Sequence, residues 1–489
     1  ATSGVLQANG VDPVLNYSNL GATFLVDLLS GGEDRLIVYG NSTSETITVT
    51  PTTVTASAQP INYANAEALT VNGQEGSDTF NVTPSAATEM FIDGGDPTGL
   101  AGDRINVTAG GNNATFYPGP ESDEGAFLIG GNLPLSYDHI EAASVTGNNT
   151  VGQTVTVYGT NADNDIKVVG LAARDFTVSV DGSPAVQYFN FPNLLVDGLA
   201  GDDDIDVDVF SLALDSLTVR GNNPSAEGDT LTVEGVLQGA DNARWTPAGV
   251  DGGSLVVGAQ TMTVQTMERL IYEGMDESES LTVNGAGRFV HTPGANRDAG
   301  LVQLDNWLAI NYLNLGLGGT VTANGTGGAD MLVALGTNGS DRIDVDFTAA
   351  NAIDVDLTSS LGVHVDLLST GVESYEIRGL EGDDDINVQA RVDASGSFAV
   401  FGGGPSAGSD TLNLTGAAGT AEAVVIRSDA GQADDQDVLG LGATIDVTGI
   451  ELITLTGQVA DLDTLDVQLG DGDNVARVAR GSDVGGANA

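Results

Sequence analysis

The chain has 489 residues, and its 68 acidic residues outnumber its 15 basic residues to give a net charge of −53. Such a charge argues against nucleic-acid partners and against anionic membrane surfaces, because phosphate groups are bound by basic surfaces. The sequence contains 67 glycines and no cysteine, so disulfides, thiolate metal sites and cysteine nucleophiles are excluded.

Short strands are the main element that the sequence predicts. Hydrophobic residues make up 41% of the chain, which is enough for a core. Segments such as Thr46–Thr50, Thr154–Val157 and Phe176–Val180 are rich in β-branched residues and bounded by Gly, Asn and Asp. No apolar run is long enough to cross a membrane. We therefore expect an all-β protein that does not insert into a membrane.

The first segment, residues 1–39, is expected to be an N-terminal cap or contact segment. It lacks the turn motif of the later chain but holds the apolar run Ala22–Leu29. The sequence begins Ala-Thr-Ser-Gly, which suits a mature extracellular chain whose signal peptide has been removed.

Three repeat modules are predicted over residues 40–158, 159–274 and 336–457. Each opens with a turn that places a glycine seven residues before an isoleucine, at Gly40, Gly159 and Gly336. Three further landmarks follow in the same order in each module, including the turns that begin at Gly73, Gly198 and Gly379. Repeats of this kind indicate a stacked array.

The remaining segments are less regular. Residues 275–335 are expected to be a partial module or insertion. Within them, Leu301–Leu317 is the most apolar region, and it fits either a short helix that caps or crosses the array or a buried strand pair. This region and Phe24–Leu29 are both candidates for caps or subunit contacts. The alternative is that both segments are part of the internal core. Residues 458–489 are expected to be a C-terminal partial repeat and a flexible, polar tail.

Two architectures fit this order of elements. One is a right-handed β-solenoid or β-helix-like repeat array, in which each coil adds one rung and the same turn recurs at a corner. The other is a row of tandem β-sandwich domains. We favour the solenoid, because the turn landmarks recur within modules as well as between them.

The turn from Gly198 to Asp206 resembles the nonapeptide of RTX (haemolysin-type calcium-binding) proteins, Gly-Gly-x-Gly-x-Asp-x-apolar-x. Leu199 stands in place of the second glycine. Similar turns start at Gly73, Gly325, Gly336 and Gly379. The modules as a whole resemble acidic Gly/Asp-rich repeats of large secreted bacterial surface proteins. Unlike RTX repeats, the copies here lie tens of residues apart rather than in immediate tandem.

The resemblance implies Ca²⁺ as a cofactor, since in that family the aspartate binds calcium between stacked turns, and calcium takes oxygen ligands. The implied metal ligands are the two aspartate triplets and three single aspartates: Asp202, Asp203, Asp204, Asp383, Asp384, Asp385, Asp78, Asp341 and Asp330. A purely structural explanation competes with this one. Glycine permits a positive φ, and an aspartate or asparagine side chain bonds the backbone of its own turn.

The structural explanation is preferred at Gly40 and Gly159. There, Glu45 and Asn164 replace the aspartate. At the two triplets a cation is favoured instead, because three adjacent carboxylates repel one another and a turn needs only one of them.

Catalysis is not expected. Among the many carboxylates no acid–base pair stands out, and no nucleophile elbow, P-loop or dinucleotide fingerprint is present. We expect a secreted structural protein that forms homo-oligomers or polymers as a surface layer, sheath or filament. The alternatives are a calcium-stabilised monomeric adhesin or carbohydrate-binding module that contacts surface glycans and, less favoured, a β-helix enzyme that degrades polysaccharide.

N-glycosylation is also permitted by the sequence. Asn-x-Ser/Thr sequons occur at Asn16, Asn41, Asn81, Asn106, Asn113, Asn148, Asn324, Asn338 and Asn413. Many such matches arise by chance in a protein rich in Asn and Thr, so the sequence alone does not assign a glycan to any of them.

Overall fold

A computed structural model provides the structure of the chain. It describes residues 3–7, 15–18, 24–56, 59–97, 102–223, 228–236, 239, 241–275, 278–360, 364–391, 393–394, 396–404, 410–417, 419–428, 435–457 and 463–468. The expected polar tail at 478–489 lies outside the described residues. Two compact units are present: unit 1 contains residues 1–243 and 248–275, and unit 2 contains residues 244–247 and 276–489.

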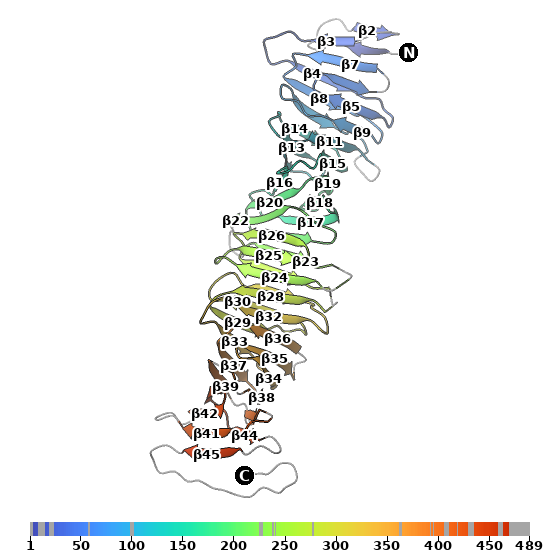
Figure 1. Ribbon diagram of the computed structural model, residues 1–489. Helices are drawn as coiled ribbons and strands as arrows, with labels where there is room; N and C mark the ends of the chain where they lie inside the picture. Colours follow the sequence, from blue (N-terminus) through green and yellow to red (C-terminus); the bar gives the residue numbers. More distant parts are fainter. Residues whose placement is uncertain are drawn as a thin grey trace. The chain divides into compact units, whose positions relative to one another are not determined.

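The strands of each unit fall into two sheets, sheet 1 and sheet 2, apart from an N-terminal hairpin of β1 (Ser3–Leu6) and β2 (Leu15–Ser18) (Figure 1). The elements of unit 1 in sheet 1 are β4 (Arg35–Tyr39), β8 (Ala68–Asn72), β10 (Glu89–Asp93), β12 (Ala114–Pro118), β13 (Gly125–Ile129), β14 (Leu135–Asp138), β16 (Thr154–Tyr158), β20 (Asn193–Ala200), β22 (Ser216–Asn223), β25 (Gly253–Val257) and β26 (Gln260–Gln265), with β24 (Asn242–Pro247) at the boundary between the units. Those in sheet 2 are β3 (Phe24–Asp27), β5 (Thr46–Thr50), β6 (Thr53–Ala56), β7 (Gln59–Ala64), β9 (Thr79–Val82), β11 (Arg104–Gly110), β15 (Ala142–Gly147), β17 (Asp165–Ala172), β18 (Asp175–Val180), β19 (Val186–Phe189), β21 (Asp204–Asp208), β23 (Thr230–Glu234) and β27 (Arg269–Glu273).

Unit 2 repeats this plan. Its sheet 1 contains β28 (Ser280–Gly285), β32 (Thr320–Gly325), β34 (Asp341–Ala349), β35 (Ala352–Ser359), β36 (His364–Thr370), β38 (Asp385–Gln389), β40 (Thr411–Thr415) and β44 (Leu452–Thr456). Its sheet 2 contains β29 (Arg288–Pro293), β30 (Gly300–Leu304), β31 (Ile310–Leu313), β33 (Met331–Leu335), β37 (Ser374–Glu381), β39 (Ser397–Gly404), β41 (Ala423–Ser428), β42 (Asp435–Leu441), β43 (Ala443–Thr448) and β45 (Thr464–Gln468). No helix able to cross a bilayer is found in the described part of the chain.

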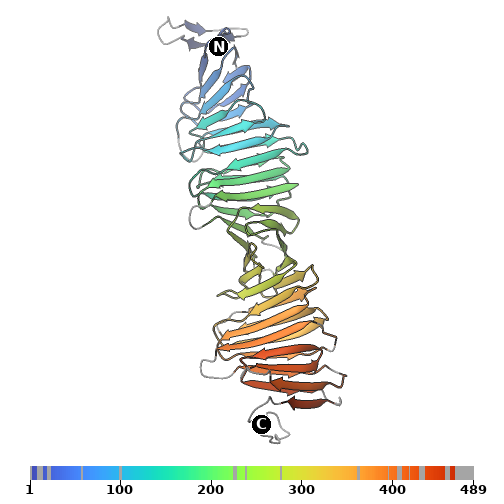
Figure 2. The same cartoon turned by 90° about the vertical axis from the view of Figure 1, so that its left-hand side faces the viewer.

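Successive coils pair in parallel and in register, so the fold is a β-solenoid-like repeat array, as predicted. Figure 2 shows these strands lying side by side within each unit. Tandem sandwiches are excluded as the overall plan, because their sheets are antiparallel.

Stacked apolar side chains form the core between the two sheets. Strands alternate buried and outward residues, as in Asp204–Asp208, where Ile205 and Val207 are fully buried. Because the strands pair in parallel register, apolar residues of successive coils lie next to one another: Ile205 lies beside Leu231, which in turn lies beside Leu270. Each such side chain contributes about 1.5–3 kcal/mol by leaving water.

Antiparallel meanders interrupt the parallel ladder. In unit 1, β5–β6–β7 and β17–β18–β19 lie in sheet 2, and β12–β13–β14 lies in sheet 1 between them in the sequence. Unit 2 has the same alternation, with β29–β30–β31 and β41–β42–β43 in sheet 2 and β34–β35–β36 in sheet 1. The predicted opening turns therefore enter different sheets: the turns at Gly40 and Gly159 precede β5 and β17 of sheet 2, but the turn at Gly336 precedes β34 of sheet 1.

The apolar region 301–317 belongs to one of these meanders. Strands β30 and β31 pair in antiparallel fashion, and Val302, Leu304, Ile310 and Tyr312 are buried. The buried strand pair is thus the correct alternative, and a helix at this point is excluded.

Candidate functional site

A ladder of buried carboxylates runs along the turns that precede the strands. Asp203, which is fully buried, precedes β21. Its Oδ1 accepts a hydrogen bond from the backbone N–H of Asn164 in the preceding coil, at 2.9 Å. Its own N–H donates to Oδ1 of Asp229 at 2.9 Å, and the N–H of Asp229 donates to Oε2 of Glu268 at 2.8 Å. Each carboxylate therefore ties one coil to the next.

The same ladder occurs in the other repeats. Near the start of unit 1, the N–H of Glu45 donates to Asp78 at 2.8 Å, the N–H of Asp78 donates to Asp103 at 2.5 Å, and the N–H of Asp103 donates to Glu141. In unit 2, the backbone of Asp341 bonds Asp384 at 2.8 Å, and that of Asp384 bonds Asp410 at 2.9 Å. Oδ1 of Asp330 accepts the N–H of Gly287 at 2.7 Å, and the backbone N–H of Asp330 donates to Oε2 of Glu373 at 2.9 Å.

The second oxygen of each ladder aspartate explains the glycine that opens the motif. A Cβ at Gly198 would lie 2.2 Å from Oδ2 of Asp203, and one at Gly379 would lie 2.1 Å from Oδ2 of Asp384. Both distances are far below van der Waals contact, so only glycine fits. The spacing of Gly and Asp in the RTX-like turns thus follows from the packing of these two residues.

Burial makes these carboxyl groups weaker acids than an aspartate in water. It raises the pKa of Asp203 to about 6 and that of Asp384 to about 7, and neighbouring carboxylates such as Asp229 and Asp410 add to the rise. Oδ2 of Asp203 and Oδ2 of Asp384 are buried and accept no hydrogen bond within the described structure.

The two aspartate triplets are not brought together around one point. Their middle members, Asp203 and Asp384, lie inside the ladder, whereas Asp204 and Asp383 are exposed. Asp202 accepts the N–H of Gly228 at 3.1 Å.

The last member, Asp385, accepts hydrogen bonds from Thr411 at 2.8 Å and from Asn413 at 2.6 Å. Asp78, Asp330 and Asp341 also belong to the ladder, as described above. Among the described residues, no three His, Asp or Glu side chains form a group that would hold a metal ion.

This geometry bears on the expected calcium. In Asp203 and Asp384, one oxygen accepts a backbone N–H of the preceding coil and the other lies against a glycine of its own turn. In Asp330 and Asp341, Oδ2 instead accepts the backbone N–H of Gly327 and of Thr337 in the same turn. Calcium binding at the turns stays a prediction, and the surface members of the triplets are the ones that remain open to solvent. At Gly40 and Gly159, Glu45 and Asn164 accept backbone hydrogen bonds from Asn41 and Thr160 of their own turns, at 2.5 and 2.6 Å.

A second feature is an acidic face on sheet 1 of unit 2, defined by Asp344, Asp346, Asp354, Asp356 and Asp366. Cross-strand register places Asp356 between Asp344 and Asp366, and sets Asp346 opposite Asp354. Four of the five, with Asn387, Gln389 and Thr415, line a groove of about 420 Å³.

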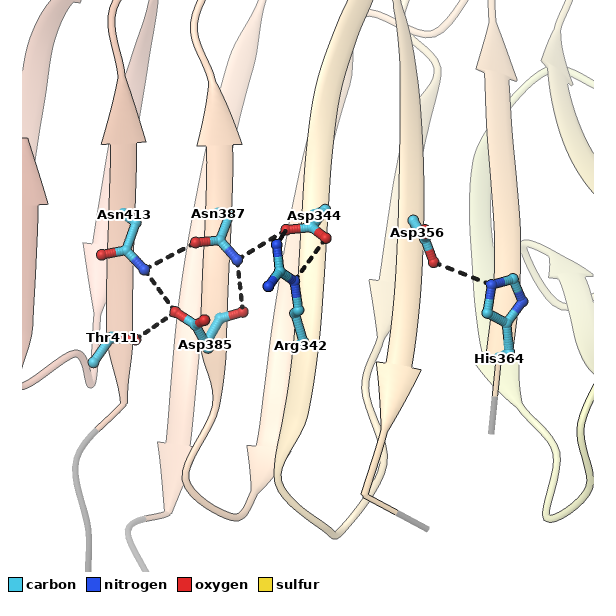
Figure 3. A network of polar contacts seen from close by, with 8 residues as sticks. All are labelled: Arg342, Asp344, Asp356, His364, Asp385, Asn387, Thr411 and Asn413. Atoms are coloured by element: carbon cyan, nitrogen blue, oxygen red, sulfur yellow. Dashed lines mark hydrogen bonds and ion pairs between the residues drawn. The ribbon is translucent and has the colours of Figure 1, made fainter. Parts of the chain in front are cut away.

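Hydrogen bonds and ion pairs satisfy only part of this face (Figure 3). Arg342 donates to both oxygens of Asp344, at 2.8 and 3.1 Å, and Asn387 donates to the same carboxylate at 2.9 Å. Nε2 of His364 lies 3.5 Å from Oδ1 of Asp356. Burial raises the pKa of Asp354 to about 6, and the carboxylates of Asp366 and Asp346 raise it further.

Sequence reasoning missed this acidic face. The alternation Asp344-Val-Asp346 and Asp354-Val-Asp356 was visible in the sequence, and only the short turn of Ala350 and Asn351 separates the two strands. Two alternating runs around a short connection are a hairpin signal, which would have placed the acids opposite one another.

Comparison with models of protein families and with characterised proteins gives no significant match. Any functional conclusion therefore depends on the geometry of this chain.

Proposed function

We propose that the protein is an extracellular structural component that assembles with copies of itself into a surface layer, sheath or filament. The observation that carries this proposal is how the strands at the two ends of the stacked coils are paired. Within the described residues, β4 pairs with one strand, β8, and β44 and β45 pair with β40 and β41 respectively. A strand with one open edge is a template for a strand of another chain.

Apolar side chains accompany these edges. On β4, Ile37 is 46% exposed and Tyr39 is 62% exposed, and on β44 Leu452 is 53% exposed. Pairing β4 of one copy with β44 of another would continue the parallel ladder and cover such side chains. Because the two surfaces differ, the contact is heterologous and generates open polymers.

The charge of −53 opposes any close approach of copies. Divalent cations, with Ca²⁺ as the first candidate, would screen or bridge the surface carboxylates and permit assembly. An extracellular setting supplies such cations, and a fold held by hydrogen-bond ladders and packing does not require disulfides.

Electron microscopy of the purified protein, with Ca²⁺ and with a chelator, tests the proposal. We expect ordered polymers with Ca²⁺ that dissociate in chelator. Replacing Ile37 by Lys should yield single particles, because the charged side chain opposes strand addition at β4. Leu317→Lys is the matched control, since Leu317 is 75% exposed in a loop, and it should leave assembly unchanged. Single particles under all salt and calcium conditions would refute the proposal.

A further inference from the structure

The structure separates the nine sequons by what their side chains do. Three of the acceptor asparagines lie within strands and donate through Nδ2 to the neighbouring coil: Asn106 to Asn81 at 3.0 Å, Asn324 to Asn284 at 2.8 Å, and Asn413 to Asn387 at 2.9 Å. An amide nitrogen held in this way, in the middle of a sheet, is not open to a modifying enzyme. Asn81, the acceptor of the first of these bonds, lies in β9 between two paired strands.

Other sequons in turns are also engaged. Nδ2 of Asn41 donates to Glu45 at 2.9 Å. Asn113 accepts the N–H of Thr154 at 3.0 Å, and its partner residue Thr115 is paired within β12. Asn338 and Ser340 are both exposed, and the hydroxyl oxygen of Ser340 accepts the N–H of Asp383 at 3.3 Å. The side chain of Asn16 lies outside the described residues.

In the sequon of Asn148, the acceptor asparagine and the hydroxyl residue are hydrogen-bonded to each other. Asn148, Asn149 and Thr150 form an exposed loop between β15 and β16. Oδ1 of Asn148 accepts the N–H of Thr150 at 3.2 Å and also the Thr150 hydroxyl. No hydrogen bond within the described structure uses Nδ2 of Asn148. The loop therefore presents the acceptor amide and the hydroxyl of the sequon together, on the surface.

Gly111 in the neighbouring turn keeps this amide uncovered. A Cβ at Gly111 would lie 3.3 Å from Nδ2 of Asn148, so a larger residue there would crowd the acceptor nitrogen. The loop itself is anchored below the acceptor, since the N–H of Gln153 donates to the carbonyl of Thr150 at 3.0 Å and the N–H of Asn149 donates to the carbonyl of Asn190 at 2.9 Å.

We propose that Asn148 is an N-glycosylation site of the folded protein. Nδ2 would attack the anomeric carbon of an oligosaccharide carried on a polyprenyl diphosphate. The new C–N bond replaces the bond from the sugar to phosphate, the lipid diphosphate leaves, and a base of the transferase takes the proton from Nδ2. This inference rests on the extracellular location in the proposed function, because such transferases act on exported chains.

Mass spectrometry of peptides from the protein exported by its own cells tests the site. We expect a glycan on the peptide that contains Asn148, its loss in Asn148→Gln and Thr150→Ala, and no glycan at Asn106, Asn324 or Asn413. Asn149→Gly is the matched control. It keeps the sequon and suits the positive φ of 63° at Asn149, so it should retain the glycan. An exported protein with unmodified Asn148, or with a glycan at Asn106, would overturn the inference and leave the structural proposal intact.

Cell fractionation separates failure of the two proposals. If the protein is not exported, the proposed location fails, and the site is then tested with purified protein, an oligosaccharyltransferase and a polyprenyl-diphosphate oligosaccharide. Transfer to Asn148 without transfer to Asn106, Asn324 or Asn413 supports the inference. Absence of transfer to Asn148 in the folded protein overturns it.

Discussion

At the scale of single residues, the turn motif contains one strained position. Leu199 and Leu380 occupy the place where RTX-like turns have a second glycine, and their φ angles are 79° and 82°. A left-handed conformation costs a residue with a side chain about 1–2 kcal/mol, and glycine adopts it without that cost.

We therefore expect Leu199→Gly to be stabilising by about 1 kcal/mol, after part of the gain is lost with the half-buried side chain. Chemical denaturation measures the change in free energy of unfolding. Leu199→Ala removes the same side chain but keeps the strain, so it should be destabilising. Equal stabilities for the two variants would show that φ at this position carries no strain.

A second prediction at this scale concerns the protonation of the ladder. Burial raises the pKa of Asp384 to about 7 in the folded protein, from about 3.8 for an aspartate in water. The folded state therefore binds more protons than the unfolded state between these values, and its stability is fully present below pH 4 and falls as the pH rises through 7. Asparagine mimics the protonated acid, as Asn164 shows by occupying the corresponding place in another turn.

Asp384→Asn should accordingly raise the free energy of unfolding at pH 8 by on the order of a few kcal/mol and change it little at pH 5. Urea denaturation at both pH values measures this difference. Asp383→Asn, at the exposed neighbour, is the control and should show no such pH dependence. The same gain at pH 5 and pH 8 would contradict a raised pKa for Asp384.

At the scale of elements, the sequence predicts strands and turns well but not their partners. Alternation in Asp204–Asp208 identifies both the strand and its buried face, because that pattern is local. The sequence offers two roles for the turn aspartates, a hydrogen bond to the backbone of their own turn and, favoured at the two triplets, a bound cation. Asp203 instead bonds the backbone of Asn164, 39 residues earlier. A partner so distant depends on the register between coils, which the local pattern does not encode.

Apart from the strand pair at 301–317, the antiparallel meanders escaped prediction for the same reason. The acidic face depends on the register of β34, β35 and β36, which sets Asp344 opposite Asp356. Like charges opposite each other destabilise a strand pair, so this part of sheet 1 is expected to be less stable than the amide-bonded pair of Asn387 and Asn413 beside it.

Asp354→Asn should relieve this repulsion. The substitution removes the charge opposite Asp346. We expect the free energy of local opening to rise by about 1 kcal/mol, which corresponds to about fivefold slower exchange of the amide hydrogens in β35 and β36. Hydrogen exchange at pH 8 and low salt measures it, and 1 M salt should reduce the difference, because it screens the wild-type repulsion. Asp466→Asn in β45 serves as the control. Unchanged exchange in β35 would mean that the face is already neutralised.

At the scale of the whole molecule, charge and fold act against each other. Each coil contacts chiefly its neighbours, so the stability of the array is a sum of local terms. The net charge of −53 opposes all of these terms together. The 15 basic residues are too few to balance it, and ions from solution must supply the remainder.

The midpoint of thermal unfolding should therefore rise with salt, and millimolar Ca²⁺ should match the effect of a much higher concentration of Na⁺ if divalent ions bind the surface carboxylates. Scanning calorimetry in NaCl, CaCl₂ and chelator measures the three midpoints. The double variant Asp202→Asn with Asp383→Asn tests whether the two aspartate triplets bind calcium, because neither residue is one of the buried aspartates of the ladder. Loss of the calcium effect with retention of the NaCl effect would assign binding to these turns. Equal midpoints for Ca²⁺ and Na⁺ at matched ionic strength would show that the cations act by screening alone.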